Sequence, residues 1–303
     1  AGADLYVTLE PCAHHGKTPP CADAMIAAGI ARVFIGMRDP NRVAAGGVDK
    51  LRAAGITVSF ADNPEPFAAI NAGWLKLLAS GSPRVTVKLG ATLDARLSFE
   101  EGTRAAMTGP SGSAVTSRLR AASDAVCVSA ATVIADDPQL TVRDSAGRRA
   151  EKQPLRVILV RQQMPPADAR VLTDGLAPTL ILASDLASDD ALDSFSRSVE
   201  IVRWSAQGGL SSAWKALGKH GVGELLVEAG PRLLTALWES EAADEYVVVS
   251  AGGMGGLRAP ALFLGEADRA GDALTPRFRP VEAGIVSDVS VTVWGAESRS
   301  HDE

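Results

Sequence analysis

Two cysteines on one short loop are the most reactive side chains in the first third of the chain. Cys12 and Cys21 flank a segment that holds His14, His15 and two prolines, between a strand-like apolar run and a predicted helix. The second cysteine stands at the helix start, where the positive end of the helix favours a thiolate. Because thiolates are ligands that zinc prefers, the spacing predicts a metal loop. The alternative is a proline-rich loop with two unrelated thiols. We expect the two histidines to contact a substrate or shape the turn, not to ligate.

A second group of polar side chains lies within residues 132–143, which read TVIADDPQLTVR. Arg143 and the upstream Arg120 stay charged at neutral pH, and each can bind phosphate oxygens through two N–H groups. The whole chain has a formal charge of −6, so a phosphate must be met by local cations of this kind. Leu140 can add an apolar or backbone contact. The pattern predicts a site for a sugar phosphate.

The acidic turn inside this segment suggests a different task. Asp136 and Thr132 can accept and donate hydrogen bonds to a cofactor, whereas Asp137, before Pro138, is expected to set the turn. Taken alone, an Asp-Asp-Pro sequence is more often a turn that connects two elements without binding a ligand. Its twelve-residue context, residues 132–143, favours a binding function.

A strand, a small-residue turn and a helix start follow one another near residue 230. Glu228 ends an apolar run, and Gly230 and Pro231 lead into a helical pattern. Backbone N–H groups at such a helix start bind phosphate, and small residues let the phosphate approach closely. The turn is therefore a candidate site for the phosphates of a cofactor.

Alternating strand and helix patterns must position these residues, which predicts an α/β protein of two domains. The first domain, residues 1–80, has strand patterns at 5–9, 33–36 and 56–60, helical patterns at 20–28 and 43–54, and a longer helix at 63–78. The break Ser80-Gly81-Ser82-Pro83 marks the boundary. The second domain, residues 83–303, has helical patterns at 111–121, 191–197, 210–218 and 231–240, and strand patterns at 85–89, 125–129, 155–160, 180–183, 201–204, 225–228 and 246–250.

Composition narrows the possible functions. The negative net charge argues against a protein that binds nucleic acid by neutralising phosphates. No apolar run approaches the roughly 20 residues that cross a bilayer, so we expect no membrane partner and a cytoplasmic location. Three cysteines are too few for a disulfide framework, and Cys127, within a predicted strand, is expected to be a small buried hydrophobe.

The cysteine loop and the 132–143 segment together resemble the bifunctional riboflavin-biosynthesis deaminase/reductase family. The loop PCAHHGKTPPC matches the family's long-spaced variant of a zinc deaminase loop, and TVIADDPQLTVR is close to its reductase signature T-V-x-x-D-D-P-x-L-T-x-R. VKLGATLD at 87–94 and VEAGPRL at 227–233 resemble the first reductase strand and the later cofactor turn. The resemblance implies a partial cytidine-deaminase-like α/β/α domain followed by a dihydrofolate-reductase-like α/β domain.

The resemblance also implies ligands and partners. The expected reaction is NADPH-dependent reduction of 5-amino-6-(5-phosphoribosylamino)uracil, a phosphoribosylated aminopyrimidine, by a homo-oligomer. Zn²⁺ is implied at Cys12 and Cys21, and substrate contacts at Arg120, Leu140, Arg143 and Glu228. Cofactor contacts are implied at Ala91, Thr132, Asp136, Ser184, Gly230, Pro231, Arg232 and Leu233.

The deaminase part departs from the family pattern. Zinc deaminases add an upstream H-x-E, which supplies a third ligand and a proton shuttle. No such motif precedes the loop, and Glu10, beside Pro11, matches a different position. We therefore expect weak zinc binding, no deamination by this chain, and a domain that lacks its beginning.

The reductase part departs at three places where the family commonly has Asp-Gly, Trp and Gly-Gly. This chain has Asp94-Ala95, Ala106 before Met107, and Ala229-Gly230. Loss of the Trp would weaken cofactor packing, and an alanine is costly wherever the backbone requires a positive φ.

The expected chemistry is hydride transfer to C1 of the sugar, for which no residue stands out as an obligatory acid. Lys88 and Asp94 are candidates through their place in the pattern alone. Two alternatives remain: a catalytically silent homologue that binds nucleotide as a scaffold or regulator, and a dihydrofolate-reductase-like enzyme with another carbonyl or imine substrate.

Overall fold

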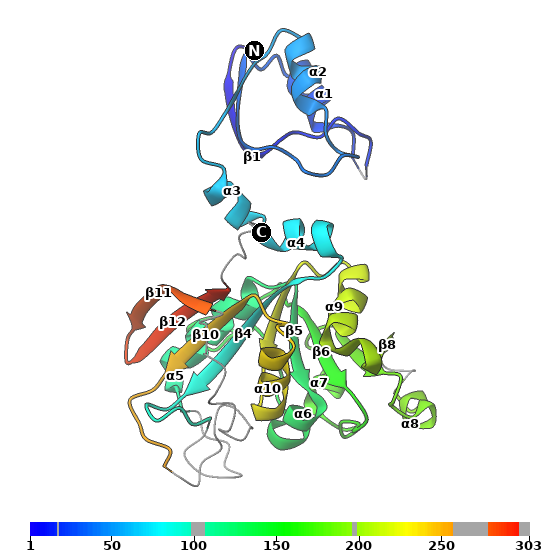
Figure 1. Cartoon of the computed structure of the whole chain (residues 1–303), viewed down its shortest axis with the longest axis vertical. Coiled ribbons are helices and arrows are strands. Elements are labelled where there is room, and N and C mark those ends of the chain that lie inside the picture. The colour runs from blue at the N-terminus through cyan, green and yellow to red at the C-terminus, as the bar shows by residue number, and fades with distance from the viewer. Residues whose placement is uncertain (17, 98–106, 196–198, 257–277, 297–303) are drawn as a thin grey trace, which may run out of the picture. The chain divides into compact units, whose positions relative to one another are not determined.

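The computed structural model divides the chain into two compact units, residues 1–79 and 80–303. It describes residues 1–16, 18–97, 107–195, 199–256 and 278–296 (Figure 1). No helix within these ranges is both long and apolar enough to cross a lipid bilayer.

The first unit is a parallel sheet whose two connecting helices pack on one face. Its strands lie in the order β1 (Asp4–Leu9), β2 (Arg32–Met37) and β3 (Thr57–Phe60). The connecting helices α1 (Cys21–Ala27) and α2 (Gly47–Ala53) bury Ala22, Val48 and Leu51 against Val33 and Ile35. The strand and helix patterns of the sequence therefore place a helix between each pair of strands.

The helix predicted over 63–78 is instead two helices, α3 (Glu65–Ile70) and α4 (Ala72–Ser80). Asn71 separates them, and its side-chain amide donates a hydrogen bond to the Phe67 carbonyl at 2.8 Å. An asparagine amide competes in this way with the backbone N–H groups that would continue a helix. The apolar repeat from which one continuous helix was predicted gives no information on such side-chain hydrogen bonds.

The second unit is built on a nine-stranded mixed sheet in the order β11-β12-β10-β4-β9-β5-β6-β7-β8. The strands from β10 to β8 are parallel, and β12 and β11 are added antiparallel at one edge. Their bounds are β4 (Arg84–Ala91), β5 (Ala125–Ser129), β6 (Leu155–Val160), β7 (Thr179–Ser184), β8 (Glu200–Trp204), β9 (Glu224–Glu228), β10 (Glu245–Ser250), β11 (Phe278–Val286) and β12 (Val289–Ala296).

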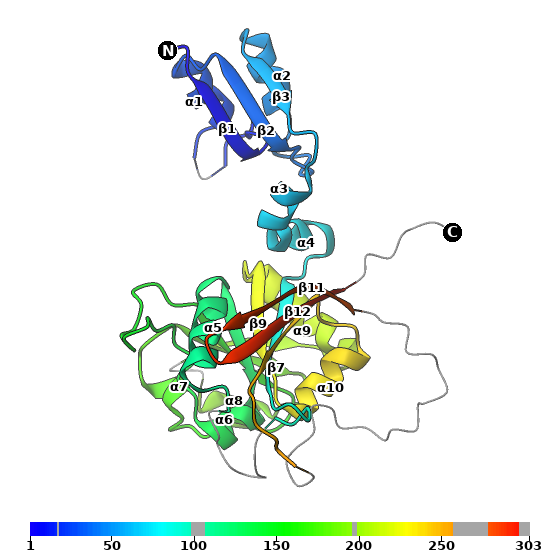
Figure 2. The same cartoon turned by 90° about the vertical axis from the view of Figure 1, so that its left-hand side faces the viewer.

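Helices cover both faces of this sheet, so the central strands are buried on both sides. On one face, α9 (Gly209–Lys219) and α10 (Pro231–Glu239) pack on alternate residues such as Val87 and Cys127. The other face carries α5 (Gly109–Ala121), α6 (Ala130–Asp136), α7 (Arg170–Thr173) and α8 (Asp189–Asp193). Figure 2 shows α5, α6 and α7 to one side of the sheet and α10 to the other.

Parallel strands end at a common edge of the sheet, and that is where α/β proteins usually bind ligands. Here β4 ends at Ala91, β5 at Ser129, β9 at Glu228 and β10 at Ser250. The order of the strands makes β4, β9 and β5 neighbours. Residues predicted from three separated parts of the sequence therefore meet at one edge.

Candidate active site

A partly buried ion pair joins α5 to the end of β9. Arg120 Nε donates to Glu228 Oε1 at 2.6 Å, and Arg120 Nη2 donates to Glu228 Oε2 at 3.0 Å. The two side chains are only 17% and 19% exposed. Arg120 Nη1 also donates to the Thr141 carbonyl at 2.9 Å. Three of the five guanidinium N–H groups are thus engaged, which leaves two for a ligand.

Lys88 lies beside this pair. It is in register with Glu228 across the β4 and β9 strands, so both side chains project from the same face of the sheet. Its ammonium reaches toward the end of β4, where Nζ is 3.8 Å from the position that a Cβ on Gly90 would occupy. Two cations and one carboxylate therefore give the edge a local positive charge within an acidic protein.

The electrostatic balance fixes the charge of each group. Burial would raise the pKa of Glu228, but the charges of Arg120 and Lys88 outweigh it and hold that pKa below its usual value. Burial lowers the pKa of Lys88, and Arg120 lowers it further, while Glu228 acts in the opposite direction. At neutral pH Glu228 is ionised, and Lys88 gives up a proton more readily than an exposed lysine.

The loop after α6 brings Arg143 to the same region. Arg143 Nη2 donates to Gln139 Oε1 at 2.8 Å, and its Nη1 donates to the Gly147 carbonyl at 3.0 Å. Leu140 has a φ of 54° and a side chain that is 2% exposed within the core. Leu140 therefore anchors the loop, and the residue offers a ligand almost no exposed surface.

The start of α6 meets the turn after β9. Ser129 caps α6 by accepting from Thr132 N at 3.2 Å, and its Oγ lies 3.1 Å from Thr132 Oγ1. A Cβ on Gly230 would lie 3.7 Å from the same Thr132 Oγ1, so this turn is open. Asp136 stands at the far end of α6. Thr132 and Gly230 are thus neighbours, whereas Asp136 is more than a helical turn away along the chain.

The helix after this turn offers a site for an anion. Gly230 precedes α10 and gives it no side-chain cap, so the first N–H groups of the helix lack that partner. Pro231 occupies the first helical position, and Arg232 is exposed beside it. Leu233 is buried in the core and fixes the helix to the sheet.

Two departures from the family sequence have opposite structural consequences. Ala229 has no positive φ, so alanine is not strained there. Ala95, in contrast, has a φ of 56°, a region that favours glycine. Ala106 lies outside the described residues.

Asp94 ties the turn after β4 to the loop after β10. Its carboxylate accepts from Thr92 Oγ1 at 2.6 Å and from the Gly255 and Gly256 N–H groups at 2.8 Å each. These hydrogen bonds, that of Thr92 first, lower the pKa of Asp94 to about 2. Asp94 is therefore a structural anion at neutral pH and a poor proton donor.

Ser184 and Ala91 mark two ends of the edge. Ala91 is buried at the end of β4, where its carbonyl accepts from Ala251 N at 2.9 Å. Ser184 ends β7 with 0% exposure, and its hydroxyl donates to the Arg161 carbonyl and accepts from Leu186 N. The exposed cation at that place is Arg161, directly after β6, and Asp185, directly after β7, is exposed too. We did not select Arg161 from the sequence, because a single arginine after a strand has no distinctive pattern.

The cysteine loop does not contain a complete metal site. Cys21 N donates to Cys12 Sγ at 3.3 Å, and the neighbouring Cys12 thiol raises the pKa of Cys21. Across the described residues, no cluster of three or more His, Cys, Asp and Glu side chains is arranged to hold a metal ion. The donor set therefore does not fit zinc in this chain.

Glu10 has a structural task beside this loop. It is buried, and its carboxylate accepts from Val48 N at 3.3 Å and from Asp39 N at 3.4 Å, which caps the start of α2. A Cβ on Gly47 would lie 1.7 Å from the Pro11 carbonyl oxygen, so α2 and the loop pack at their closest possible approach.

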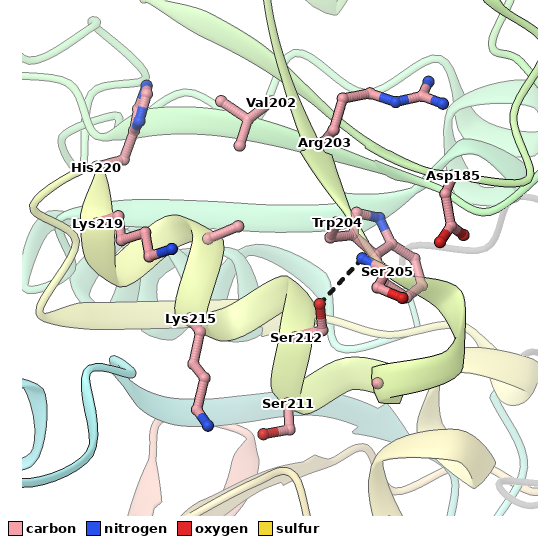
Figure 3. A pocket seen from close by; sticks show the side chains of 12 residues that line it. Asp185, Val202, Arg203, Trp204, Ser205, Ser211, Ser212, Lys215, Lys219 and His220 are labelled. Carbon is pink, nitrogen blue, oxygen red and sulfur yellow. Dashed lines mark hydrogen bonds between the residues drawn. The ribbon is translucent and has the colours of Figure 1, made fainter.

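A surface groove of about 780 Å³ lies between α9 and the outermost strand β8 and reaches Asp185, directly after β7. Figure 3 shows Lys215 and Lys219 on α9, and the Ser212 hydroxyl accepting from Ser205 N at 3.0 Å. None of the predicted site residues lines it. We assign the groove no part in the chemistry.

Known proteins resemble this chain in sequence and in structure. Residues 83–287 match the family described as the RibD C-terminal domain. The riboflavin biosynthesis protein RibD of Escherichia coli is 38% identical over 258 residues, which cover 82% of this chain and 70% of that protein.

Solved structures agree with the sequence relatives. RibD of Acinetobacter baumannii superposes with a TM-score of 0.84 at 32% identity, over 97% of this chain and 80% of that one. A riboflavin biosynthesis reductase of Saccharomyces cerevisiae has a TM-score of 0.52 at 15% identity, over 76% of this chain and 99% of that one. The second likeness concerns the fold alone.

Proposed function

The chain belongs to the RibD family of riboflavin biosynthesis proteins, and from this we propose that its second unit reduces 5-amino-6-(5-phosphoribosylamino)uracil to the ribitylamino compound with NADPH. The observation that carries the proposal is the cluster of Lys88, Arg120 and Glu228 at the sheet edge, beside the open start of α10. This cluster places fixed charges where a sugar and a dinucleotide phosphate would meet.

The residues around Gly230 fit a dinucleotide. The uncapped start of α10 and the exposed Arg232 can bind a pyrophosphate, and the open space at Gly230 lets it approach the backbone. Thr132 can hydrogen-bond the cofactor from the neighbouring first turn of α6. Ala91 would lie near the nicotinamide, at the end of β4.

The substrate would lie on the side of α5 and the 139–143 loop. Arg143 and the two remaining N–H groups of Arg120 can hold the sugar phosphate. Glu228 completes this surface. Gln139 and Glu228 orient the two guanidinium groups before the substrate arrives, so less ordering is needed on binding.

The chemistry needs a hydride and a proton. When bound, the reduced nicotinamide supplies the hydride to C1 of the open imine form of the sugar. The imine nitrogen then needs a proton, and Lys88 is the group that holds one at this edge. Burial lowers its pKa, so the transfer is easier than from an exposed lysine. Asp94, with a pKa of about 2, does not hold one at neutral pH.

We propose no deaminase activity for this chain. Cys12 and Cys21 supply two thiols, and the donor set described above does not fit zinc. Zinc added to the protein is expected to bind weakly through these thiols alone.

The test is oxidation of NADPH by the purified protein, with and without the ribosylamino-uracil phosphate. We expect substrate-dependent loss of nicotinamide absorbance together with the ribitylamino product. Arg120→Ala should lower kcat/KM by about 10²-fold, which corresponds to a loss on the order of 3 kcal/mol. Arg118→Ala is the control: it removes an exposed arginine of the same helix and should leave kcat/KM unchanged. NADPH binding without oxidation would support a silent nucleotide-binding homologue, and oxidation with only another imine or carbonyl would support a different reductase.

A further inference from the structure

We propose that Arg161 binds the 2′-phosphate of the dinucleotide and so makes this chain prefer NADPH to NADH. The inference rests on the proposed reductase function and names the side chain that selects the cofactor. It starts from the burial of Ser184, which leaves Arg161 as the exposed cation at the adjacent strand ends, where the other exposed charged group is the carboxylate of Asp185.

The backbone at Arg161 is fixed from two sides. Val160 is in register with Ala183 across β6 and β7, and the Ser184 hydroxyl donates to the Arg161 carbonyl. The side chain is exposed and directly follows the last residue of β6. Arg161 therefore presents its charge from a rigid strand end.

The guanidinium of Arg161 is available for a ligand. Throughout the part of the chain that the structure describes, no side chain or carbonyl pairs with it, unlike Arg120, Arg156 and Arg170, which all bind acidic residues. A planar guanidinium with several free N–H groups matches a phosphate dianion better than it matches ribose hydroxyls.

The distance along the edge suits an extended dinucleotide. β9 and β5 separate β4 from β6, so Ala91 and Arg161 lie about three strand spacings apart, on the order of 14 Å. The start of α10, at Gly230, follows β9 between them. A cofactor with its nicotinamide near β4 and its pyrophosphate at α10 would extend its adenosine toward β6.

Two neighbouring groups could act differently. Arg232 is also exposed, but it belongs to the first turn of α10 and would serve the pyrophosphate, which both cofactors share. Asp185, after Ser184, is a carboxylate whose Oδ1 accepts from Ala206 N at 2.9 Å. If Asp185 bound the ribose hydroxyls instead, the chain would favour NADH.

The experiment compares two probes by calorimetry with the full chain: 2′,5′-ADP, which carries the 2′-phosphate, and 5′-AMP, which lacks it. We expect the wild type to bind 2′,5′-ADP at least 10-fold more tightly than 5′-AMP. Arg161→Gln should weaken 2′,5′-ADP by about 10- to 100-fold, the loss of one hydrogen-bonded charge contact, and should leave 5′-AMP unchanged.

Matched variants separate this role from a general effect of charge. Lys215→Gln removes an exposed cation of α9 in the groove of Figure 3 and should change neither affinity. Arg232→Gln should weaken NADPH and NADH by the same factor. Circular dichroism and thermal unfolding should show Arg161→Gln folded as the wild type, because the side chain is exposed.

The two proposals can fail separately. Equal affinity of the wild type for both probes, or unchanged affinity of Arg161→Gln for 2′,5′-ADP, would overturn the role of Arg161, even if NADPH reduces the substrate. Binding of 2′,5′-ADP that depends on Arg161, without any turnover, would support Arg161 and contradict the reductase function.

Discussion

Replacing Glu228 by glutamine tests whether the buried pair with Arg120 holds the site together. The change keeps the shape of the side chain but removes the carboxylate that accepts at 2.6 and 3.0 Å from the guanidinium. Arg120 and Lys88 then face each other without their counter-charge. Breaking a buried pair costs roughly 3–5 kcal/mol, and the remaining exposure of about one-fifth places the loss near the lower value, about 3 kcal/mol.

The assay is thermal unfolding followed by tryptophan fluorescence. Four of the five tryptophans, all but Trp74, lie in the second unit, so the signal reports mainly on that unit. A loss of about 3 kcal/mol in a unit of this size corresponds to a fall in Tm of about 6–12 °C. Glu200→Gln is the control, because its carboxylate pairs with His220 at 61% exposure and should change stability by less than about 0.5 kcal/mol.

The pH dependence gives the sign of the effect. The folded pKa of Glu228 lies below its ordinary value of 4.5, so the stability it adds is complete above the unfolded pKa and is lost as pH falls through the folded pKa. The difference in free energy of unfolding between wild type and Glu228→Gln should therefore be constant around neutral pH and shrink toward zero in acid. A loss below about 1 kcal/mol at neutral pH, or a difference that persists unchanged in acid, would refute this reasoning.

Three further predictions concern single positions. Ala95→Gly should stabilise the protein by about 0.5–1 kcal/mol, because φ is 56° there. Ala122→Gly, with φ −85°, should destabilise it, and urea unfolding of both variants checks the sign of the change in free energy of unfolding. Lys88→Met should lower kcat by about 10²- to 10⁴-fold and remove the alkaline fall in rate that the wild type shows as Lys88 loses its proton; a retained alkaline limb would contradict this role. Gly47→Ala should destabilise the first unit by about 1–3 kcal/mol, because its Cβ would lie 1.7 Å from the Pro11 carbonyl oxygen; faster alkylation of the two loop thiols would show it, and unchanged labelling would contradict it.

The fold class follows from the sequence because apolar periodicity and chain order decide it. Strand patterns from 85–89 to 246–250 were enough to predict the α/β class, and the family resemblance of the motifs implied the reductase fold; the related solved structures confirm both. The hairpin of β11 and β12 was not predicted. β11 is exposed along most of its length, so it has no alternation of buried and exposed residues for a pattern to reveal.

The sequence predicted site residues that hold a fixed place in a long motif. It did not predict which side chains near the site are buried and therefore cannot contact a ligand. Arg120 and Glu228 are far apart in sequence, yet the fold packs α5 near β9, and the Arg120 side chain reaches Glu228 at the end of that strand. Leu140 and Ser184 were expected to meet ligands, but their side chains are buried. The sequence around the ends of β6 and β7 does not tell that Ser184 is buried while Arg161 is exposed, and for this reason Arg161 was not selected.

The most direct measurement of the central claim is the fate of deuterium carried at the hydride position of NADPH. After a single turnover with 5-amino-6-(5-phosphoribosylamino)uracil, mass spectrometry should find the label on C1 of the ribityl chain, and Lys88→Met should slow its arrival. A product without deuterium, or labelled NADPH that survives unchanged beside intact substrate, would contradict the assignment.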